Sequence, residues 1–305
     1  MRKKEMANKK LFQPDLPLAK DTLAVAQQDL DAAMCLYNHG YYPQTIFFLQ
    51  QGVEKGWKAF GYHLGTISPI EARKSKDVGH KGAKVGKITL LKLRRGIISP
   101  TIQQVKMIRG CIASPQAEEL TEYYSYLNNL EADLLWAQKE IDKVTDTPHT
   151  PTPEELKKRL NEFCIEEQTE RACEDLITSP EFDPEIGKLI RARAIKEVYA
   201  KIGSTPASEI LIKDTINGTF DDQRLKAILL SAMKGMVIIS PLLYFAIITQ
   251  AHENRCRYPD KGRTPLDEYT QNHTLIVYFP SIAHTVQASL EKMDELFRLP
   301  TFGGQ

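Results

Sequence analysis

Apolar residues recur at helical spacing along almost the whole chain. In the segment 17–37, leucines and alanines are separated by three or four positions, which places them on one face of an α-helix. Gly40 follows this pattern and suits the left-handed conformation that often ends a helix. A second apolar stripe covers residues 43–64 and ends at Gly65. The two segments predict an antiparallel helical hairpin.

The rest of the chain continues in the same way. Helical patterns are found at 101–110, 117–144, 154–177, 184–202, 207–216, 221–239, 241–256 and 281–298. No alternating pattern typical of strands and hairpins occurs, so we predict an all-α fold. Ser240-Pro241 predicts the start of a new helix, because proline is favoured in the first helical turn.

Composition allows a folded protein and excludes several classes. The chain has 305 residues, of which 42% are apolar and 26% charged, so it can bury a core and is not a disordered chain. Its five cysteines are scattered without a CxxC pair, which argues against a disulfide framework or a zinc knuckle and favours the reducing cytoplasm. We expect no metal and no cofactor.

Two segments bear on membranes and secretion. The basic N-terminal tail, residues 1–16, lacks the apolar stretch of a signal peptide. The most apolar stretch, 235–250, is shorter than the ~20 residues of a membrane span and contains proline. We therefore expect a buried helix there and no association with a membrane.

Charge is balanced over the whole chain but not locally. The formal net charge is +1, yet residues 73–95 contain nine basic residues and one acidic residue. This segment lacks a clear apolar stripe. It contains glycines at 79, 82 and 86 and is followed by another at 96, so we expect it to be mobile when free. It can follow a phosphate backbone, although a charge run is also typical of a solvated surface. It contains no aromatic residue for base stacking.

Two blocks of residues carry a family resemblance. The first is the F-x-x-Q-Q-x-x-E-K-x-x-K-A pattern at 47–59 in the second predicted helix. The second is Arg257-Tyr258-Pro259-Asp260, followed by Thr264-Pro265 and Glu268-Tyr269; a smaller match is Gly79-His80-Lys81. With these motifs the chain resembles the HEPN family (higher eukaryotes and prokaryotes nucleotide-binding).

The resemblance implies an antiparallel four-helix bundle interrupted by a large helical insertion. We therefore predict a core of 17–98 and 225–298, with 99–224 as the insertion or a second subdomain. The alternative is two separate domains, in which case the match at 257–260 is accidental. The order and spacing of the second block favour the interrupted bundle.

The resemblance and the charge pattern together name candidate binding residues. Gln50, Glu54 and Lys58 share one helix face through their i, i+4 spacing. The full set for a nucleotide or RNA is Gln50, Glu54, Lys58, Lys81, Lys84, Arg257 and Tyr258. The alternatives are a structural polar network for the first three residues and a structural turn for the last two.

Arg73 and His80 are candidate catalytic residues. Their spacing matches the R-x(4–6)-H motif of HEPN ribonucleases. Histidine titrates near neutral pH and can move the proton of a ribose 2′-OH, while arginine can bind the phosphate without a metal ion. The alternative is a basic loop in which His80 caps a helix or forms a hydrogen bond.

These observations lead to one predicted function and one alternative. The first is an RNA- or nucleotide-binding protein of a prokaryotic toxin–antitoxin, stress or phage-defence system, either a metal-independent endoribonuclease or a non-catalytic binder. The resemblance also implies a homodimer and an antitoxin or nucleotidyltransferase partner. The alternative is a non-catalytic helical dimerisation or scaffolding protein without any role in RNA binding.

Overall fold

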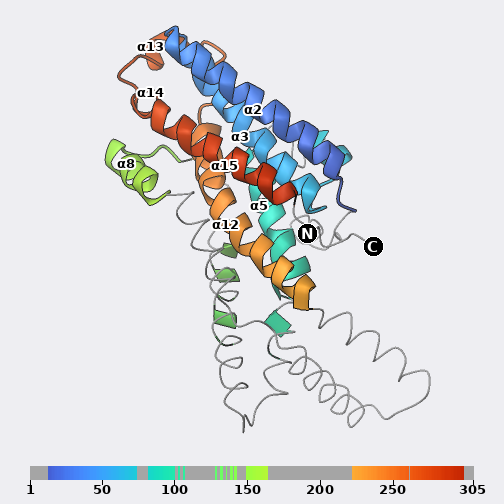
Figure 1. Cartoon of the computed structure of the whole chain (residues 1–305). Coiled ribbons are helices and arrows are strands. Elements are labelled where there is room, and N and C mark those ends of the chain that lie inside the picture. Colours follow the sequence, from blue (N-terminus) through green and yellow to red (C-terminus); the bar gives the residue numbers. More distant parts are fainter. Residues whose placement is uncertain are drawn as a thin grey trace, which may run out of the picture. The chain divides into compact units, whose positions relative to one another are not determined.

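The protein is all-α in the part of the chain that the structure describes (Figure 1). This computed structural model describes residues 13–73, 82–99, 149–163, 222–260 and 262–298, with the backbone alone at most positions of 222–236, and isolated positions between 102 and 142. Within these residues the sole β-type pairing is an isolated bridge between Asp260 and Arg263.

The helices keep the labels of Figure 1. They are α2 (Leu16–Asn38), α3 (Tyr42–His63), α4 (Pro69–Arg73), α5 (Gly82–Leu93), the π-helix η2 (Arg94–Ile98), α8 (Pro153–Glu162), α12 (Asp222–Gln250), α13 (Pro265–Glu268), α14 (Thr274–Val277) and α15 (Phe279–Phe297).

Contacts divide the chain into two compact units. The first contains Met1–Leu93, Val144–Arg171 and Met233–Gln305, and the second contains Arg94–Lys143 and Ala172–Ala232. The two blocks that carry the resemblance therefore belong to one unit. That unit also takes in Val144–Arg171, which the sequence analysis assigned to the insertion.

Helices α2 and α3 form the predicted antiparallel hairpin. Asp15 caps α2 by accepting a hydrogen bond from the backbone N–H of Leu18 at 3.0 Å. Gly40, in the connection, has φ +77°, the left-handed conformation that the sequence predicted. The helices approach closely at Gly52, where an added Cβ would lie 3.1 Å from the carbonyl oxygen of Ala26.

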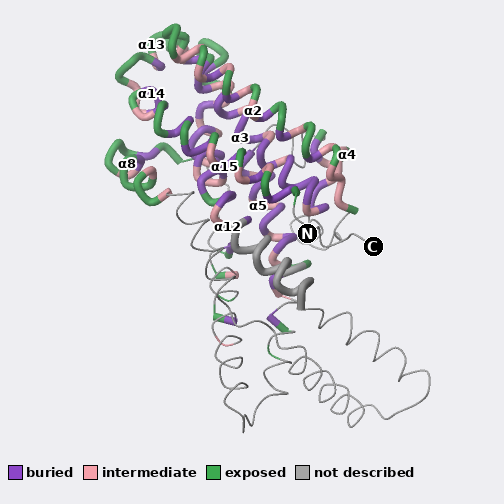
Figure 2. Tube along the Cα trace, in the orientation of Figure 1, coloured by how far each residue is buried: buried purple, intermediate pink, exposed green. Residues whose placement is uncertain are grey.

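Helix α15 completes this part of the core by packing on both α2 and α3. Its first residue, Phe279, stacks on Tyr37 at the end of α2, with ring centres 4.7 Å apart. Its last residue, Phe297, stacks on His63 at the end of α3, with ring centres 4.4 Å apart. Fifteen of the 22 residues of α3 are buried, which makes it the central helix of the unit (Figure 2).

Helix α5 corrects the prediction of a mobile segment without an apolar stripe. Its buried face contains Gly82, Gly86, Thr89 and Lys92 beside its aliphatic residues. The pattern of apolar residues in the sequence therefore does not reveal this face. The glycines let α5 approach α3 closely: a Cβ at Gly86 would lie 2.9 Å from Cε2 of Trp57. Here glycine serves helix packing and not mobility.

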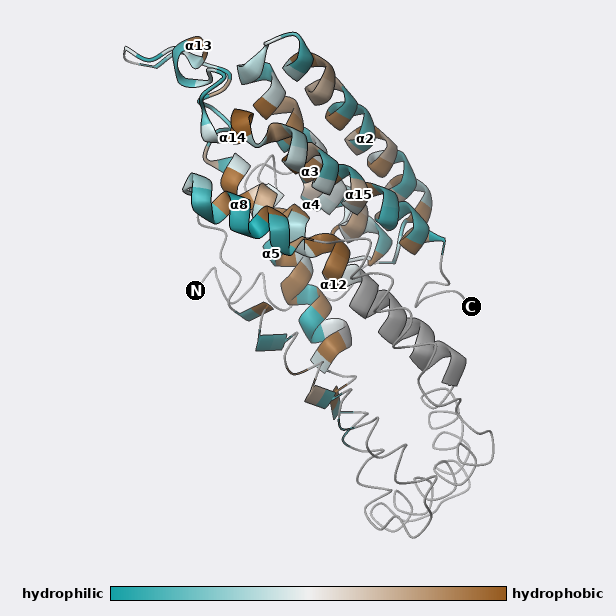
Figure 3. Ribbon diagram, turned by 60° about the vertical axis from the view of Figure 1, so that its left-hand side comes forward, coloured by the Kyte–Doolittle hydropathy of each residue, from teal (hydrophilic) through white to brown (hydrophobic). Residues whose placement is uncertain are grey.

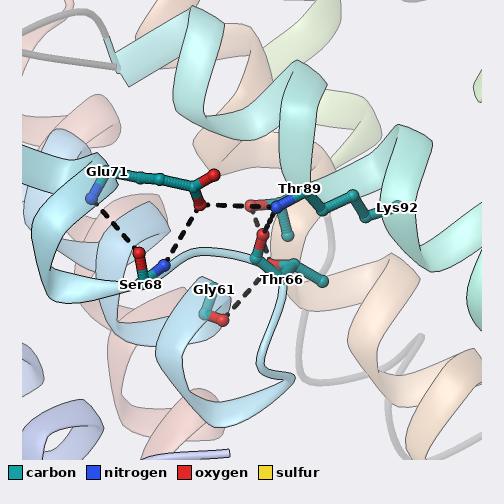
Figure 4. Close-up of polar contacts among 6 residues, drawn as sticks. All are labelled: Gly61, Thr66, Ser68, Glu71, Thr89 and Lys92. Carbon is teal, nitrogen blue, oxygen red and sulfur yellow. Dashed lines mark hydrogen bonds and ion pairs between the residues drawn. The ribbon is translucent and has the colours of Figure 1, made fainter. Parts of the chain in front are cut away.

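A polar network fastens α4 to α5 (Figure 4). Ser68 and Glu71 form a capping box: the backbone N–H of Glu71 donates to Ser68 Oγ at 3.2 Å, and that of Ser68 donates to Glu71 Oε2 at 3.3 Å. Lys92 donates to the Thr66 carbonyl oxygen, and its Nζ lies 3.4 Å from Glu71 Oε2. The Thr66 hydroxyl donates to that of Thr89 at 3.2 Å.

Helix α12 corrects a second prediction, because it continues through Pro241 where a new helix was expected. Proline inside a helix removes one hydrogen bond and costs about 3 kcal/mol. The burial of Ile238, Leu242 and Phe245 on either side offsets this cost. No helix in the described part of the chain combines the length and apolar content that a membrane span needs.

Helix α8 is short and largely hydrophilic (Figure 3). Thr152 caps its start, and Leu156 is its one buried residue. It ends at Glu162, inside the helix predicted from 154 to 177, of which residues 164–177 lie outside the described residues. Phe163, which follows, has a non-helical conformation and packs with Tyr244 and Phe245 of α12.

Candidate nucleic-acid interface

A tight turn follows α12 and contains the Arg257-Tyr258-Pro259-Asp260 motif. The backbone N–H of Asp260 donates to the Arg263 carbonyl at 3.0 Å, and that of Arg263 donates to the Asp260 carbonyl at 2.6 Å. Gly262 has φ +82°, a conformation that favours glycine and closes the reversal. The turn thus has a defined backbone, and Arg257 and Tyr258 project from it as exposed side chains.

Arg257 connects this turn to α3. Its guanidinium carbon lies 5.0 Å from the ring centre of Phe47 and 5.0 Å from that of Tyr258, within the range of cation–π attraction. Phe47 is the first residue of the pattern at 47–59. The structure therefore brings one predicted binding residue, Arg257, against the helix that carries three others.

Those three residues of α3 are less accessible than the sequence suggested. Gln50 is 3% exposed and Glu54 is 2% exposed. A Cβ added at Gly82 of α5 would lie 3.4 Å from the Glu54 Cα and 3.5 Å from the Ala246 Cβ of α12, so two helices cover this face. Gln50 and Glu54 do not reach a surface where RNA can bind.

The polar residues on this face of α3 differ in their contacts with one another. Lys58 Nζ donates to Glu54 Oε1 at 2.5 Å, one helical turn away. The two amide atoms of Gln50 have no hydrogen-bond partner within the described residues. Such unpaired buried groups cost free energy, so Gln50 does not strengthen the fold by hydrogen bonding.

The structure describes only one of the two predicted catalytic residues, so their pairing stays a prediction. Arg73 is exposed at the end of α4. His80 and Lys81 lie outside the described residues, as does the chain that connects them to Arg73. Lys84 is half-buried in the first turn of α5.

A small pocket opens beside the turn. Its cavity measures about 90 Å³, enough for several water molecules. The lining residues are Arg255, Tyr258, Asp260, Arg263, Thr264 and Glu268. Arg255 Nη1 lies 3.6 Å from Glu268 Oε1. Of these six residues, Tyr258 alone is among the site residues predicted from the sequence, although three arginines within nine positions, 255–263, also point to this turn.

A cluster of aromatic side chains begins at Tyr269, the residue that follows Glu268 of the pocket. His252 Nδ1 and the Tyr269 hydroxyl are 2.7 Å apart in a hydrogen bond, and the His273 ring packs against both side chains. Burial, with smaller contributions from His273 and Arg255, lowers the pKa of His252 to about 4, so the ring is neutral at pH 7. The cluster therefore fixes α13 and α14 without adding charge.

The side chains at this surface carry groups that can contact a nucleic acid. Arginine guanidinium groups donate hydrogen bonds to phosphate, and an exposed tyrosine offers a face for a base. Among the described residues, no group of three or more His, Cys, Asp or Glu side chains could hold a metal ion.

Comparisons with known proteins do not identify the chain. No family model, curated protein or solved structure matches it.

Proposed function

We propose that this protein binds RNA or nucleotides through the exposed surface around Tyr258. The observation that supports this proposal most strongly is Tyr258, a residue that is 57% exposed, has the Arg257 guanidinium against its ring and shares a pocket with Arg255 and Arg263. Single-stranded RNA is bound in this way, by stacking of bases on aromatic rings and by contacts of cations with phosphates. In line with the resemblance to the HEPN family, we assign the protein to a prokaryotic toxin–antitoxin, stress or defence system.

The scaffold beneath this surface favours binding. The turn is closed by two backbone hydrogen bonds, and Arg257 rests on Phe47 of α3. A turn held in one conformation loses little entropy when its side chains engage a ligand. The proposed contact does not include Gln50 and Glu54, because both are buried, and their role as direct ligands stays a prediction.

The proposal is tested by fluorescence anisotropy with a labelled single-stranded RNA. We expect affinity to fall steeply between about 50 and 200 mM salt. Tyr258→Ala should weaken binding roughly 5- to 100-fold, since one stacked base contributes about 1–3 kcal/mol. Arg263→Ala should also weaken binding, because it removes one of the arginines that line the pocket.

The matched control is Arg159→Ala on α8, which removes an arginine that is 54% exposed outside this surface. Its affinity should equal that of the wild type. Competition with mononucleotides separates a nucleotide ligand from an RNA ligand. If neither RNA nor mononucleotides bind at low salt, the proposed function is wrong.

A catalytic version of this proposal uses Arg73 and His80. Arg73 would hold the phosphate and His80 would move the proton, so no metal would be needed. The test is incubation of the protein with total RNA in EDTA. Cleavage by the wild type but not by His80→Ala supports a nuclease, whereas equal cleavage by both proteins removes His80 from the mechanism.

Two exposed apolar side chains favour a second candidate, a dimerisation or scaffolding protein. Leu266 of α13 is 72% exposed and Val277 of α14 is 54% exposed. Contiguous exposed apolar patches mark protein interfaces, whereas single exposed apolar residues are common on any surface, so the experiment has to separate the two cases. Sedimentation velocity on the wild type and on Leu266→Ser and Val277→Ser tests this candidate, which requires self-association that the substitutions weaken.

A further inference from the structure

The pocket beside Tyr258 contains acidic side chains as well as arginines, whereas binding of a phosphate requires only the arginines. Two of its lining residues are the carboxylates Asp260 and Glu268, which repel a phosphate backbone. An ionised carboxylate only accepts hydrogen bonds, so its ligand has to present N–H or O–H groups. This combination of arginine, carboxylate and aromatic ring points to a base and not only to the backbone of RNA.

Glu268 is the carboxylate that the surrounding structure holds in place. It is the last residue of α13, and its side chain is 22% exposed. The Thr264 hydroxyl caps α13 by accepting from the Asp267 N–H at 3.2 Å. The next residue, Tyr269, is 1% exposed and is bonded to the buried His252. Arg255, 3.6 Å from the carboxylate, orients it at the pocket.

Guanine has the hydrogen-bonding pattern that these groups complement. Among the four RNA bases, guanine alone presents two adjacent donors, N1–H and N2–H₂, which match the two oxygens of a carboxylate. It also presents two adjacent acceptors, O6 and N7, which arginine binds bidentately. Adenine, cytosine and uracil each place an acceptor where a carboxylate would repel it.

We propose that the Tyr258 pocket selects guanine. Glu268 accepts hydrogen bonds from N1–H and N2–H₂, Arg263 donates to O6 and N7, and the Tyr258 ring stacks on the base. This inference rests on the proposed binding of RNA or nucleotides and names the base that is preferred. Guanine in a single-stranded RNA and guanine in a free nucleotide offer the same groups, so the test has a separate arm for each.

The test compares labelled 12-nucleotide oligouridine RNAs with either two central guanines or two central adenines, and titrates GMP and AMP by calorimetry. The wild type should bind the guanine RNA at least about fivefold tighter than the adenine RNA, the lower limit for one bidentate recognition. Glu268→Gln keeps the size of the side chain but adds a donor. It should reduce this ratio below about twofold without weakening binding of the adenine RNA.

The control is Glu295→Gln on α15, which removes a carboxylate that is 57% exposed outside the pocket and should leave the ratio unchanged.

Equal binding of both RNAs by the wild type overturns the choice of guanine and leaves RNA binding intact. An unchanged ratio in a folded Glu268→Gln protein overturns the role of Glu268. Selective binding of GMP without any RNA binding supports the pocket with a free nucleotide as its ligand, and failure of all four ligands overturns both proposals.

Discussion

Arg257 lies over the aromatic ring of Phe47, with its guanidinium carbon 5.0 Å from the ring centre. The two residues belong to sequence blocks separated by most of the chain, and their contact fastens the turn at 257–260 to α3. A cation–π contact of this kind contributes about 0.5–1 kcal/mol at a partly exposed site.

A double-mutant cycle with Phe47→Leu and Arg257→Ala measures this contact. We expect a coupling free energy of about 0.5–1 kcal/mol in urea unfolding, because each single change removes the same interaction. RNA affinity should fall in both single variants, since the turn that presents Tyr258 is then less firmly held. Additive effects on the free energy of unfolding would contradict the contact.

Gly86→Ala should destabilise the protein by about 1–2 kcal/mol. The added Cβ would lie 2.9 Å from Cε2 of Trp57 and 3.1 Å from Cδ1 of Leu243, and this overpacking exceeds the gain in helix propensity. The matched control is Gly235→Ala, whose Cβ would lie 3.5 Å from Cζ of Phe60, an ordinary contact. That change should stabilise the protein by up to about 1 kcal/mol. Both are measured by urea unfolding, and a stabilising Gly86→Ala would show that α5 does not need glycine there.

Lys92→Met should lower the free energy of unfolding by about 1–3 kcal/mol. Lys92 is 8% exposed, and its loss leaves the Thr66 carbonyl and the Glu71 carboxylate without its hydrogen bonds. The double variant Lys92→Met with Glu71→Leu should recover part of this loss, since no carboxylate is then left behind. Lys292→Met, which breaks the exposed pair with Glu295, should cost less than about 1 kcal/mol. Equal losses in the two single variants would argue against a special role for the buried pair.

Stability should fall as the pH is lowered from about 6.5 to 4. Burial lowers the pKa of His63 to about 4, and burial, with smaller contributions from His273 and Arg255, lowers that of His252 to about 4. Both histidines titrate near 6.5 in the unfolded chain, which therefore binds more protons in this range. The stabilisation is complete above pH 6.5 and is lost as the pH falls towards 4.

Urea unfolding at pH 7, 5.5 and 4.5 measures this dependence, with a loss of about 1–3 kcal/mol expected for each histidine. His63→Leu should flatten the slope by roughly half. A pH-independent free energy of unfolding in the wild type would contradict the burial of both rings.

Local patterns in the sequence determined the parts of the fold that depend on one helix at a time. The α2–α3 hairpin and α15 follow directly from apolar residues at intervals of three and four, and the left-handed Gly40 follows from its place after a helix. The sequence also identified the turn at 257–260, because Pro259 fixes its own φ and Gly262 can adopt the positive φ that the reversal needs. The binding function and the resemblance to the HEPN family stay predictions.

Tertiary packing decided which polar and small residues are buried and where a helix continues, and the pattern of apolar residues does not contain this information. α5 buries glycine, threonine and lysine, because close approach to α3 and a buried ion pair with Glu71 replace apolar side chains there. Pro241 stays inside α12, because burial on both sides outweighs one lost hydrogen bond. Gln50 and Glu54 share a helix face with Lys58, but α5 and α12 cover them. The pocket at Tyr258, by contrast, forms where α13 folds back onto the turn. Which polar side chains meet solvent depends on neighbours that are distant in the sequence, so the three-dimensional packing alone settles it.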